Sequence, residues 1–225
     1  MSNENQKRPL RKLFVLILFP KFFDMNEEKL NITIKSAELF MKYGVRSITM
    51  DDVAKHLGMS KKTIYKHFAD KTDLIKTCVD YNIEHHSQCI KQKYNSDENA
   101  IDVLLSVHKM VNTMLKNINP SFEYDLEKYY PEIYLMIKEK RAENMISSIS
   151  KNLEKGQKEG LYRANMDIEI ITKLFVSNME SFHLSRHFTQ EDLYSSKVFQ
   201  EIFNYHIHGI ASNKGIKYLN DNYNL

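Results

Sequence analysis

The chain has 225 residues, of which 42% are hydrophobic and 27% are charged, enough material for one large domain or two small ones. It contains only 6 Gly and 4 Pro, too few for the frequent turns of a β-sandwich or barrel, so the composition predicts an all-α fold. The two cysteines, Cys78 and Cys89, exclude a disulfide framework and a Cys-rich zinc site, and they fit a cytoplasmic protein. Neither GxxxxGK nor GxGxxG occurs, so a nucleotide-binding α/β fold is not expected.

Charge is distributed unevenly along the chain, although the net charge is only +3 at pH 7. Residues 1–75 contain 14 Lys or Arg against 9 Asp or Glu, whereas residues 76–225 contain 18 against 20. A basic first third beside a slightly acidic remainder predicts a polyanionic partner for the N-terminal part of the chain.

The first 25 residues place four basic side chains before a short apolar run from Leu13 to Phe19. The order resembles the start of a signal peptide, but Pro20 and Lys21 end the run without a small-residue cleavage site. Seven apolar residues are too few for a membrane span, which needs about 20. We therefore predict an extension that is disordered or not native to the protein, and no membrane partner. An amphipathic surface anchor is the alternative.

Residues 26–72 have the pattern of a small helical DNA-binding domain. Apolar residues recur at helical spacing over 27–43 and predict a first helix. Thr49, with an acid three residues later, predicts a capped short helix. Gly58 predicts a turn, and Ser60 predicts the start of a second short helix. Two short helices joined by a Gly-containing turn, the second rich in Lys, indicate a helix-turn-helix.

The second short helix carries side chains suited to DNA. Ile64 and Phe68 are its apolar positions, so its Lys, Thr, Tyr and His side chains should point outward. Lysines can reach phosphates or base edges in the major groove, and hydroxyls near helix ends can hold phosphates. The alternative is a solvated Lys-rich helix face, but that alternative does not account for a capped pair of two-turn helices.

The stretch from Ile48 to Lys71, ITMDDVAKHLGMSKKTIYKHFADK, resembles the DNA-binding signature of the TetR family, and the resemblance covers residues 32–75. It implies a homodimeric repressor that binds double-stranded operator DNA and is released by a small effector. The resemblance implies phosphate contacts at Thr49, Ser60, Tyr65, His67 and Lys71. It implies base or backbone contacts at Lys61, Lys62, Thr63 and Lys66. Lys62 departs from the family, which commonly has Gly there, so its target is open between guanine and phosphate.

The rest of the chain predicts a larger helical body over residues 73–213 for effector binding and dimerisation. Its helices are expected at 71–94, 100–117, 122–129, 131–153, 167–187 and 192–211. With the N-terminal unit, this makes about nine helices in total. Residues 214–225 are predicted to form a frayed polar tail.

Apolar residues on the last two helices cover too wide an arc for a surface helix. Pairing with the same helices of a second copy would cover them, and the TetR-family resemblance implies the same homodimer. The residues predicted at this interface are Phe175, Met179, Phe182, Phe199, Ile202, Phe203 and Ile210. The alternative is a monomer that buries these helices internally.

The middle of the body is rich in Met, Phe and Tyr, side chains that line adaptable cavities. Together with the resemblance, this predicts a pocket for an apolar or aromatic effector. The candidate lining residues are Tyr81, Met110, Met114, Phe122, Tyr134, Phe175 and Met179. The alternative is an ordinary hydrophobic core.

No catalytic chemistry is predicted, because no nucleophile is recognisable beside a base. His183 and His187 are four residues apart on one helix, but spacing fixes no third metal ligand near them. We therefore expect no enzyme activity, cofactor or metal. The predicted function is a transcriptional repressor released from DNA by a small ligand. A DNA-binding regulator without a small ligand and a helical protein–protein adaptor are the alternatives.

Overall fold

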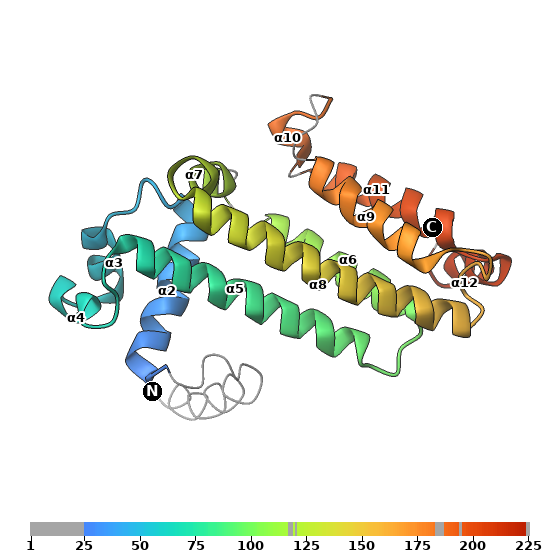
Figure 1. Ribbon diagram of the computed structural model, residues 1–225, viewed down its shortest axis with the longest axis horizontal. Coiled ribbons are helices and arrows are strands. Elements are labelled where there is room, and N and C mark those ends of the chain that lie inside the picture. The colour runs from blue at the N-terminus through green and yellow to red at the C-terminus, as the bar shows by residue number, and fades with distance from the viewer. Residues whose placement is uncertain (1–24, 117–118, 120, 183–186, 194, 224–225) are drawn as a thin grey trace. The chain divides into compact units, whose positions relative to one another are not determined.

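The computed structural model describes residues 25–116, 119, 121–182, 187–193 and 195–223. Within these ranges the chain is helical, apart from connecting turns and one isolated bridge between Tyr162 and Ala211, so the predicted all-α fold is confirmed. The predicted N-terminal extension lies outside the described residues, except for Met25. The chain forms two compact units (Figure 1). The N-terminal unit comprises the residues up to Cys89 with Ser121–Ile137, and the C-terminal unit comprises Ile90–Pro120 with Lys138–Leu225.

The helices of the N-terminal unit enclose a small apolar core. They are α2 (Glu27–Tyr43), α3 (Met50–Leu57), α4 (Lys61–Tyr65), the first part of α5 (Lys71–Tyr94), α7 (Ser121–Tyr129) and the start of α8 (Pro131–Lys158). The side chain of Asn26 caps α2 by accepting the backbone N–H of Lys29, and Gly44 ends the helix at a φ of 81°. The largest fully buried core side chains are Ile32, Phe40, Ile64, Phe68, Leu74, Ile75 and Leu126.

Helix α7 belongs to the N-terminal unit, whereas the sequence placed residues 122–129 in the effector-binding body. The carboxylate of Asp125 accepts a hydrogen bond from the backbone N–H of Arg46 at 3.0 Å. Gly44 permits this close approach, because a Cβ there would lie 2.8 Å from Ser121 Oγ and 2.9 Å from Asp125 Oδ2. These contacts join segments far apart in sequence, so local periodicity does not reveal them.

Helix α5 runs without interruption through both units, so the predicted domain boundary after residue 72 falls inside a helix. Leu74 and Ile75 are buried in the N-terminal unit. Cys78 is buried there as well, and its Sγ donates to the carbonyl of Thr33 at 3.3 Å. The first turns of α5 are therefore part of the core that supports α2.

Among its described residues, the C-terminal unit contains the remainder of α5 and α8 and five further helices. These are α6 (Ala100–Lys116), α9 (Ile168–Phe182), α10 (Gln190–Leu193), α11 (Ser196–Ile210) and α12 (Asn213–Tyr223). Helix α8 continues to Lys158, beyond the predicted end at residue 153, and Gly156 lies within it. The missing side chain of Gly156 gives room to the ring of Tyr162, so this Gly serves packing and does not end the helix.

The prediction of a frayed polar tail over residues 214–225 is wrong for the residues described there, which form α12. Leu219 is fully buried in the core of the C-terminal unit. The hydroxyls of Tyr218 and Tyr223 donate to the carboxylate of Asp102, at 2.8 and 2.6 Å. The two hydroxyls hold α12 to the first turn of α6. The polar composition of the segment conceals these long-range contacts.

Candidate nucleic-acid interface

Helices α3 and α4 meet across a short turn in the N-terminal unit. Thr49 and Asp52 form a reciprocal capping box at the start of α3, with the Thr49 N–H donating to the Asp52 carboxylate at 2.8 Å. Gly58 ends α3 in the left-handed conformation at a φ of 65°, which glycine adopts without steric cost. The side chain of Ser60 then caps α4 by accepting the backbone N–H of Thr63 at 3.1 Å.

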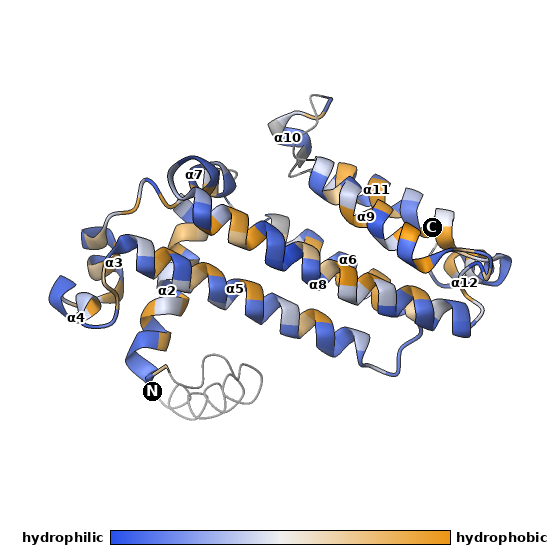
Figure 2. Cartoon of the chain, in the orientation of Figure 1, coloured by the Kyte–Doolittle hydropathy of each residue, from blue (hydrophilic) through white to orange (hydrophobic). Residues whose placement is uncertain are grey.

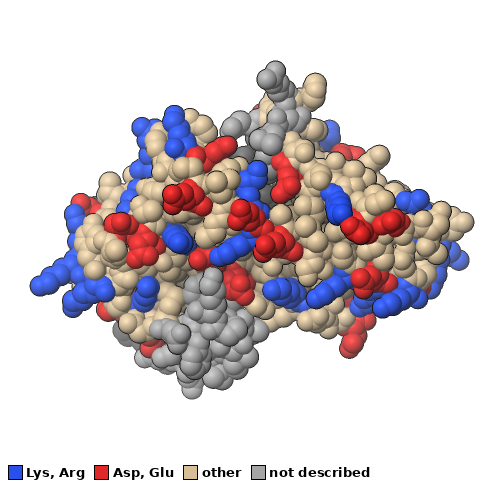
Figure 3. Space-filling model, viewed as in Figure 1, with Lys and Arg blue, Asp and Glu red and all other residues tan. Residues whose placement is uncertain are grey.

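Helix α4 is held by its apolar side and exposes its polar side. Ile64 is completely buried and Phe68, just beyond the helix, is 1% exposed. The side chains of Lys61, Lys62, Tyr65 and Lys66 are exposed, and those of Thr63 and His67 are half-buried. Figure 3 shows Lys and Arg side chains projecting where α3 and α4 lie. The helix thus presents cations outward from a fixed apolar anchor.

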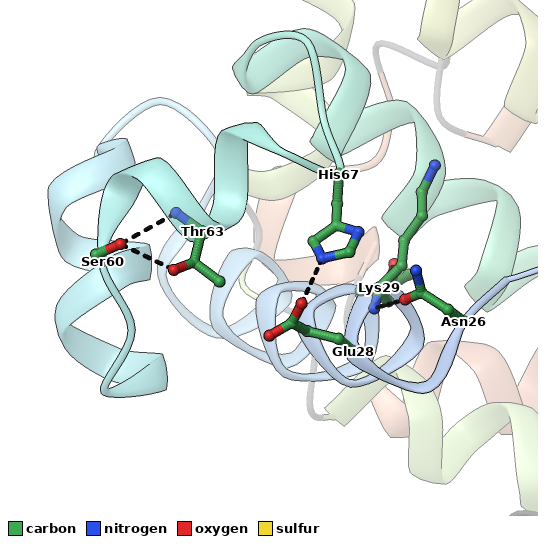
Figure 4. A network of polar contacts seen from close by, with 7 residues as sticks. Asn26, Glu28, Lys29, Ser60, Thr63 and His67 are labelled. Carbon is green, nitrogen blue, oxygen red and sulfur yellow. Dashed lines mark hydrogen bonds and ion pairs between the residues drawn. The ribbon is translucent and has the colours of Figure 1, made fainter.

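Several of the polar side chains around α4 already have partners within the protein. Figure 4 shows two of these contacts, the hydrogen bond of Thr63 to Ser60 at 2.8 Å and that of His67 Nε2 to Glu28 at 2.7 Å. Lys61 forms an ion pair with Asp51 at 3.1 Å. A phosphate that binds Lys61 or His67 therefore competes with a carboxylate of the protein.

Two ionisable groups beside α4 have shifted pKa values. Hydrogen bonds from the side chain and backbone of Thr49 lower the pKa of Asp52, because they stabilise its charged form. At the start of α5, partial burial lowers the pKa of Lys71, while Asp125 and Asp52 oppose that shift. Lys71 is thus electrostatically coupled to acidic groups of its own unit.

Thr49→Ala should destabilise the N-terminal unit by about 1 kcal/mol, because the capping hydroxyl of α3 is lost. The same change should raise the pKa of Asp52, which NMR titration of its carboxyl measures. Because the pKa of Asp52 is lower in the folded than in the unfolded protein, the capping box stabilises the fold most at pH values above the unfolded pKa. This stabilisation is lost as the pH falls through the folded pKa. Thr49→Ser keeps the hydroxyl and is the control. Equal urea stability of the two variants would contradict this role.

The predicted dimer residues divide between core and surface. Phe203 and Ile210 are buried in the C-terminal unit's own core, where α11 packs against α6, so these two are corrected to internal positions. Phe199 stacks on His108 but is only half-buried. Phe175, Met179 and Ile202 are half-buried, and the side chain of Phe182 lies outside the described part of the chain. Apolar residues also run along α9 and α11 in Figure 2, and the exposed ones are Ile170, Leu174 and Tyr205.

The predicted pocket residues belong to different units. In the N-terminal unit, Phe122 and Tyr81 are buried, and Tyr81 packs against Leu30 and Ile34 as ordinary core. Tyr134 belongs to the same unit, whereas Met110, Met114, Phe175 and Met179 belong to the C-terminal unit. None of the seven lines the open surface pocket of about 420 Å³ in the N-terminal unit, whose walls are Tyr43, Arg46, Ser47, Ser121 and Asp125.

The interior of the C-terminal unit holds two histidines that the sequence analysis did not select. The imidazole of His108 stacks on the rings of Phe199 and Phe203, at centroid distances of 4.5 and 4.0 Å. His206 lies against Phe175 at 4.3 Å, and its Nε2 is buried with no hydrogen-bond partner among the described residues. Burial lowers the pKa of His206 to about 4 and also lowers that of His108. Both rings are therefore packed as neutral aromatic groups.

His206→Leu should reduce the acid sensitivity of the C-terminal unit. Because the pKa of His206 is about 4 when folded and about 6.5 when unfolded, its contribution to stability is complete above about pH 6.5 and falls towards pH 4. Leu has no unpartnered nitrogen, so the free energy of unfolding, measured by urea denaturation, should fall less between about pH 7 and pH 5 in the variant than in the unchanged protein. His108 contributes to the fall in both of these proteins. His208→Leu, at an exposed position, is the control, and an unchanged loss in His206→Leu would refute the assignment.

The described residues contain neither a metal-binding cluster nor a membrane-spanning helix. No group of three or more His, Cys, Asp or Glu there is placed to hold a metal ion. His183, which lies four residues before His187 in the sequence, is outside the described residues. No helix in these ranges is both long and apolar enough to cross a bilayer.

The geometry around α3 and α4 defines a class of protein. Two short helices joined by a tight Gly turn, with the second anchored by Ile64 and exposing cations, form a helix-turn-helix of the kind that binds DNA. Residues 32–78 of this unit match the model of bacterial regulatory proteins of the tetR family. The N-terminal unit thus contains a DNA-binding domain of the tetR type, and the predicted resemblance is confirmed for these residues.

Curated relatives share part of the chain. A helix-turn-helix-type transcriptional regulator of Staphylococcus aureus strain MRSA252 is 30% identical over 122 residues, which are 49% of this chain and 65% of the relative. Another, from strain USA300, is 37% identical over 86 residues, covering 36% of this chain and 46% of the relative. The match thus spans less than two-thirds of either relative's length.

Solved structures share the fold over most of the chain. A TetR-family transcriptional regulator from Cytophaga hutchinsonii has a TM-score of 0.62 at 17% identity, covering 85% of this chain and 100% of that one. Regulatory protein TetR from Rhodobacter sphaeroides has a TM-score of 0.63 at 12% identity, covering 83% and 100%. At these identities the likeness concerns the fold alone.

Proposed function

We propose that this protein is a sequence-specific transcriptional regulator that binds operator DNA with α4 in the major groove. The observation that carries the proposal is the outer face of α4, where Lys62 and Lys66 are exposed opposite the buried Ile64. A recognition helix held from behind by apolar contacts can insert such side chains between the two phosphate backbones. As a bacterial regulator of transcription, the protein acts in the cytoplasm.

Phosphate contacts are assigned to the side chains that flank α4. Hydroxyl, imidazole and ammonium groups there can hydrogen-bond phosphate oxygens, which fixes the position of a protein on the duplex. The assigned residues are Thr49, Ser60, Tyr65, His67 and Lys71. On binding, His67 would exchange Glu28 for a phosphate, and Lys61 would exchange Asp51.

Glu28→Gln should tighten DNA binding by roughly two- to fivefold, because it removes the carboxylate that competes with phosphate for His67. Fluorescence anisotropy with a labelled promoter duplex measures the change. Glu38→Gln is the matched control, since it alters the net charge equally on an exposed position of the same helix, about 15 Å further along α2. The explanation fails if both variants bind with the same affinity.

A homodimer is proposed because Ile170, Leu174 and Tyr205 on α9 and α11 are exposed apolar residues, and contact with a second copy of the chain would bury them. A two-fold dimer would present two copies of α4 to half-sites about 34–36 Å apart. Sedimentation velocity of the full chain measures the oligomeric state, and a monomer at micromolar concentration would contradict this assignment.

A small apolar or aromatic effector is proposed to release the repressor from DNA. The aromatic interior of the C-terminal unit supports this, since Phe175, Phe199 and Phe203 gather around His108 and His206. A ligand acts only through a difference in its affinity for the free and DNA-bound forms. Thermal-shift screening with hydrophobic compounds tests the proposal. A chain that none of them stabilises would favour the alternative of a regulator without a small ligand.

A gel-shift titration with the promoter DNA next to the protein's own gene tests DNA binding directly. Binding should prefer that promoter over unrelated duplex and should weaken as salt rises, because phosphate contacts release counterions. Equal binding to both duplexes would contradict sequence-specific regulation.

A further inference from the structure

The outermost ridge of α4 consists of two lysines. Successive residues of a helix are separated by about 100°, so Lys62 and Lys66, each two residues from Ile64, lie about 160° from that buried side chain. Lys66 follows the helix as its C-cap and keeps right-handed helical angles, with φ −69° and ψ −25°. Lys61, Thr63 and Tyr65 lie closer to the core, at about 60° to 100° from Ile64. The two ridge lysines therefore point most directly away from the protein.

The ridge and the flanks of α4 also differ in their partners. On the two sides of the helix that flank this ridge, Lys61 forms an ion pair with Asp51 at 3.1 Å, and the hydroxyl of Thr63 is hydrogen-bonded to that of Ser60 at 2.8 Å. The ammonium groups of Lys62 and Lys66, by contrast, make no hydrogen bond or ion pair within the described part of the chain. These two cations are thus free for an external acceptor, without displacing a group of the protein.

A helix lying in the major groove directs its ridge at the base edges and its flanks at the phosphates on either side. A Lys ammonium has three donors and no acceptor. Guanine alone offers two adjacent acceptors in that groove, O6 and N7, whereas adenine pairs one acceptor with an amino donor. The ridge chemistry therefore matches guanine better than any other base.

We infer that Lys62 and Lys66 are the base-reading residues of this regulator, and that each reads the guanine of one G·C pair. The inference rests on the proposed function, and it assigns the specificity of that same site. The two positions are separated by about 6 Å along the helix, and bases are stacked about 3.4 Å apart. The two guanines should therefore lie within about three consecutive base pairs.

The experiment begins by selecting bound duplexes from a randomised pool with the full chain. Affinities of the unchanged protein, Lys62→Ala, Lys66→Ala and Lys61→Ala are then measured on the selected duplex and on versions with single G·C to A·T changes. The affinity of the unchanged protein should fall roughly 5- to 150-fold for a change at either of two nearby positions in a half-site. The affinity of Lys62→Ala should no longer depend on the base pair at one of these positions, and that of Lys66→Ala should no longer depend on the base pair at the other. Lys61→Ala should keep both sensitivities and weaken binding equally on every duplex.

Modified bases identify the groove that is read. Replacing each selected guanine by 7-deazaguanine removes the N7 acceptor of the major groove and should weaken binding by the unchanged protein. Inosine removes only the minor-groove amino group and should leave the affinity within about twofold, because O6 and N7 remain. A loss with inosine as large as that with 7-deazaguanine would overturn the inference.

Two other outcomes separate this inference from the proposed function. In the first, Lys62→Ala and Lys66→Ala weaken binding equally on all duplexes, and each reduces the slope of log affinity against log salt concentration by about one. Both lysines then hold phosphates. That result overturns the inference and leaves the regulator intact. If the unchanged protein enriches no sequence from the pool, the proposed function itself fails.

Discussion

Gly156→Ala is expected to destabilise the C-terminal unit by about 3 kcal/mol or more. A Cβ on Gly156 would lie 2.0 Å from Cδ2 and 2.3 Å from Cε2 of the Tyr162 ring. That ring is 1% exposed, and its hydroxyl donates to Asn152 Oδ1 at 2.9 Å. The ring cannot swing aside without losing this buried hydrogen bond, so the extra methyl group displaces a fully packed aromatic side chain.

The control for this prediction is Gly209→Ala in α11. A Cβ there would meet nothing within 4 Å, so the substitution should stabilise the chain by up to about 1 kcal/mol through helix propensity alone. Urea denaturation followed by far-ultraviolet circular dichroism compares the two variants. If Gly156→Ala is as stable as Gly209→Ala, the contact between Gly156 and Tyr162 is not a tight one.

The helix-turn-helix could be predicted from sequence because its signals are local. Thr49 and Asp52 are three residues apart, as are Ser60 and Thr63, so each cap lies within one turn of chain. The direction of α4 follows from the burial of Ile64, which apolar spacing already indicated. Family resemblance added the roles of individual side chains, which spacing alone does not supply.

Contacts between distant segments could not be predicted in this way. The place of α7 depends on Asp125 reaching the backbone of Arg46, 79 residues away. Helix α12 depends on Tyr223 reaching Asp102, 121 residues away. An apolar side chain such as Phe203 is suited equally to a dimer interface and to the core of its own chain, so composition could not distinguish those two environments. Periodicity shows that a helix face is buried, but it does not show which partner covers it.

Reversing both ridge charges, by Lys62→Glu with Lys66→Glu, is expected to lower DNA affinity roughly 100-fold or more at about 0.1 M salt. Two favourable contacts become two carboxylates facing a polyanion. Neither lysine is paired within the described residues, so folding should be unaffected, and thermal melting checks this. Anisotropy titration on a promoter duplex measures the loss.

The matched control changes the same net charge away from the proposed interface. Lys91→Glu with Lys93→Glu alters two exposed residues in the last turns of α5, so its effect on binding is confined to long-range electrostatics, which salt screens over about 10 Å. The control should therefore stay within a few-fold of the unchanged protein, while the ridge variant loses binding at every salt concentration. Equal losses in the two double variants would mean that the net charge of the chain, and not the ridge of α4, attracts the DNA.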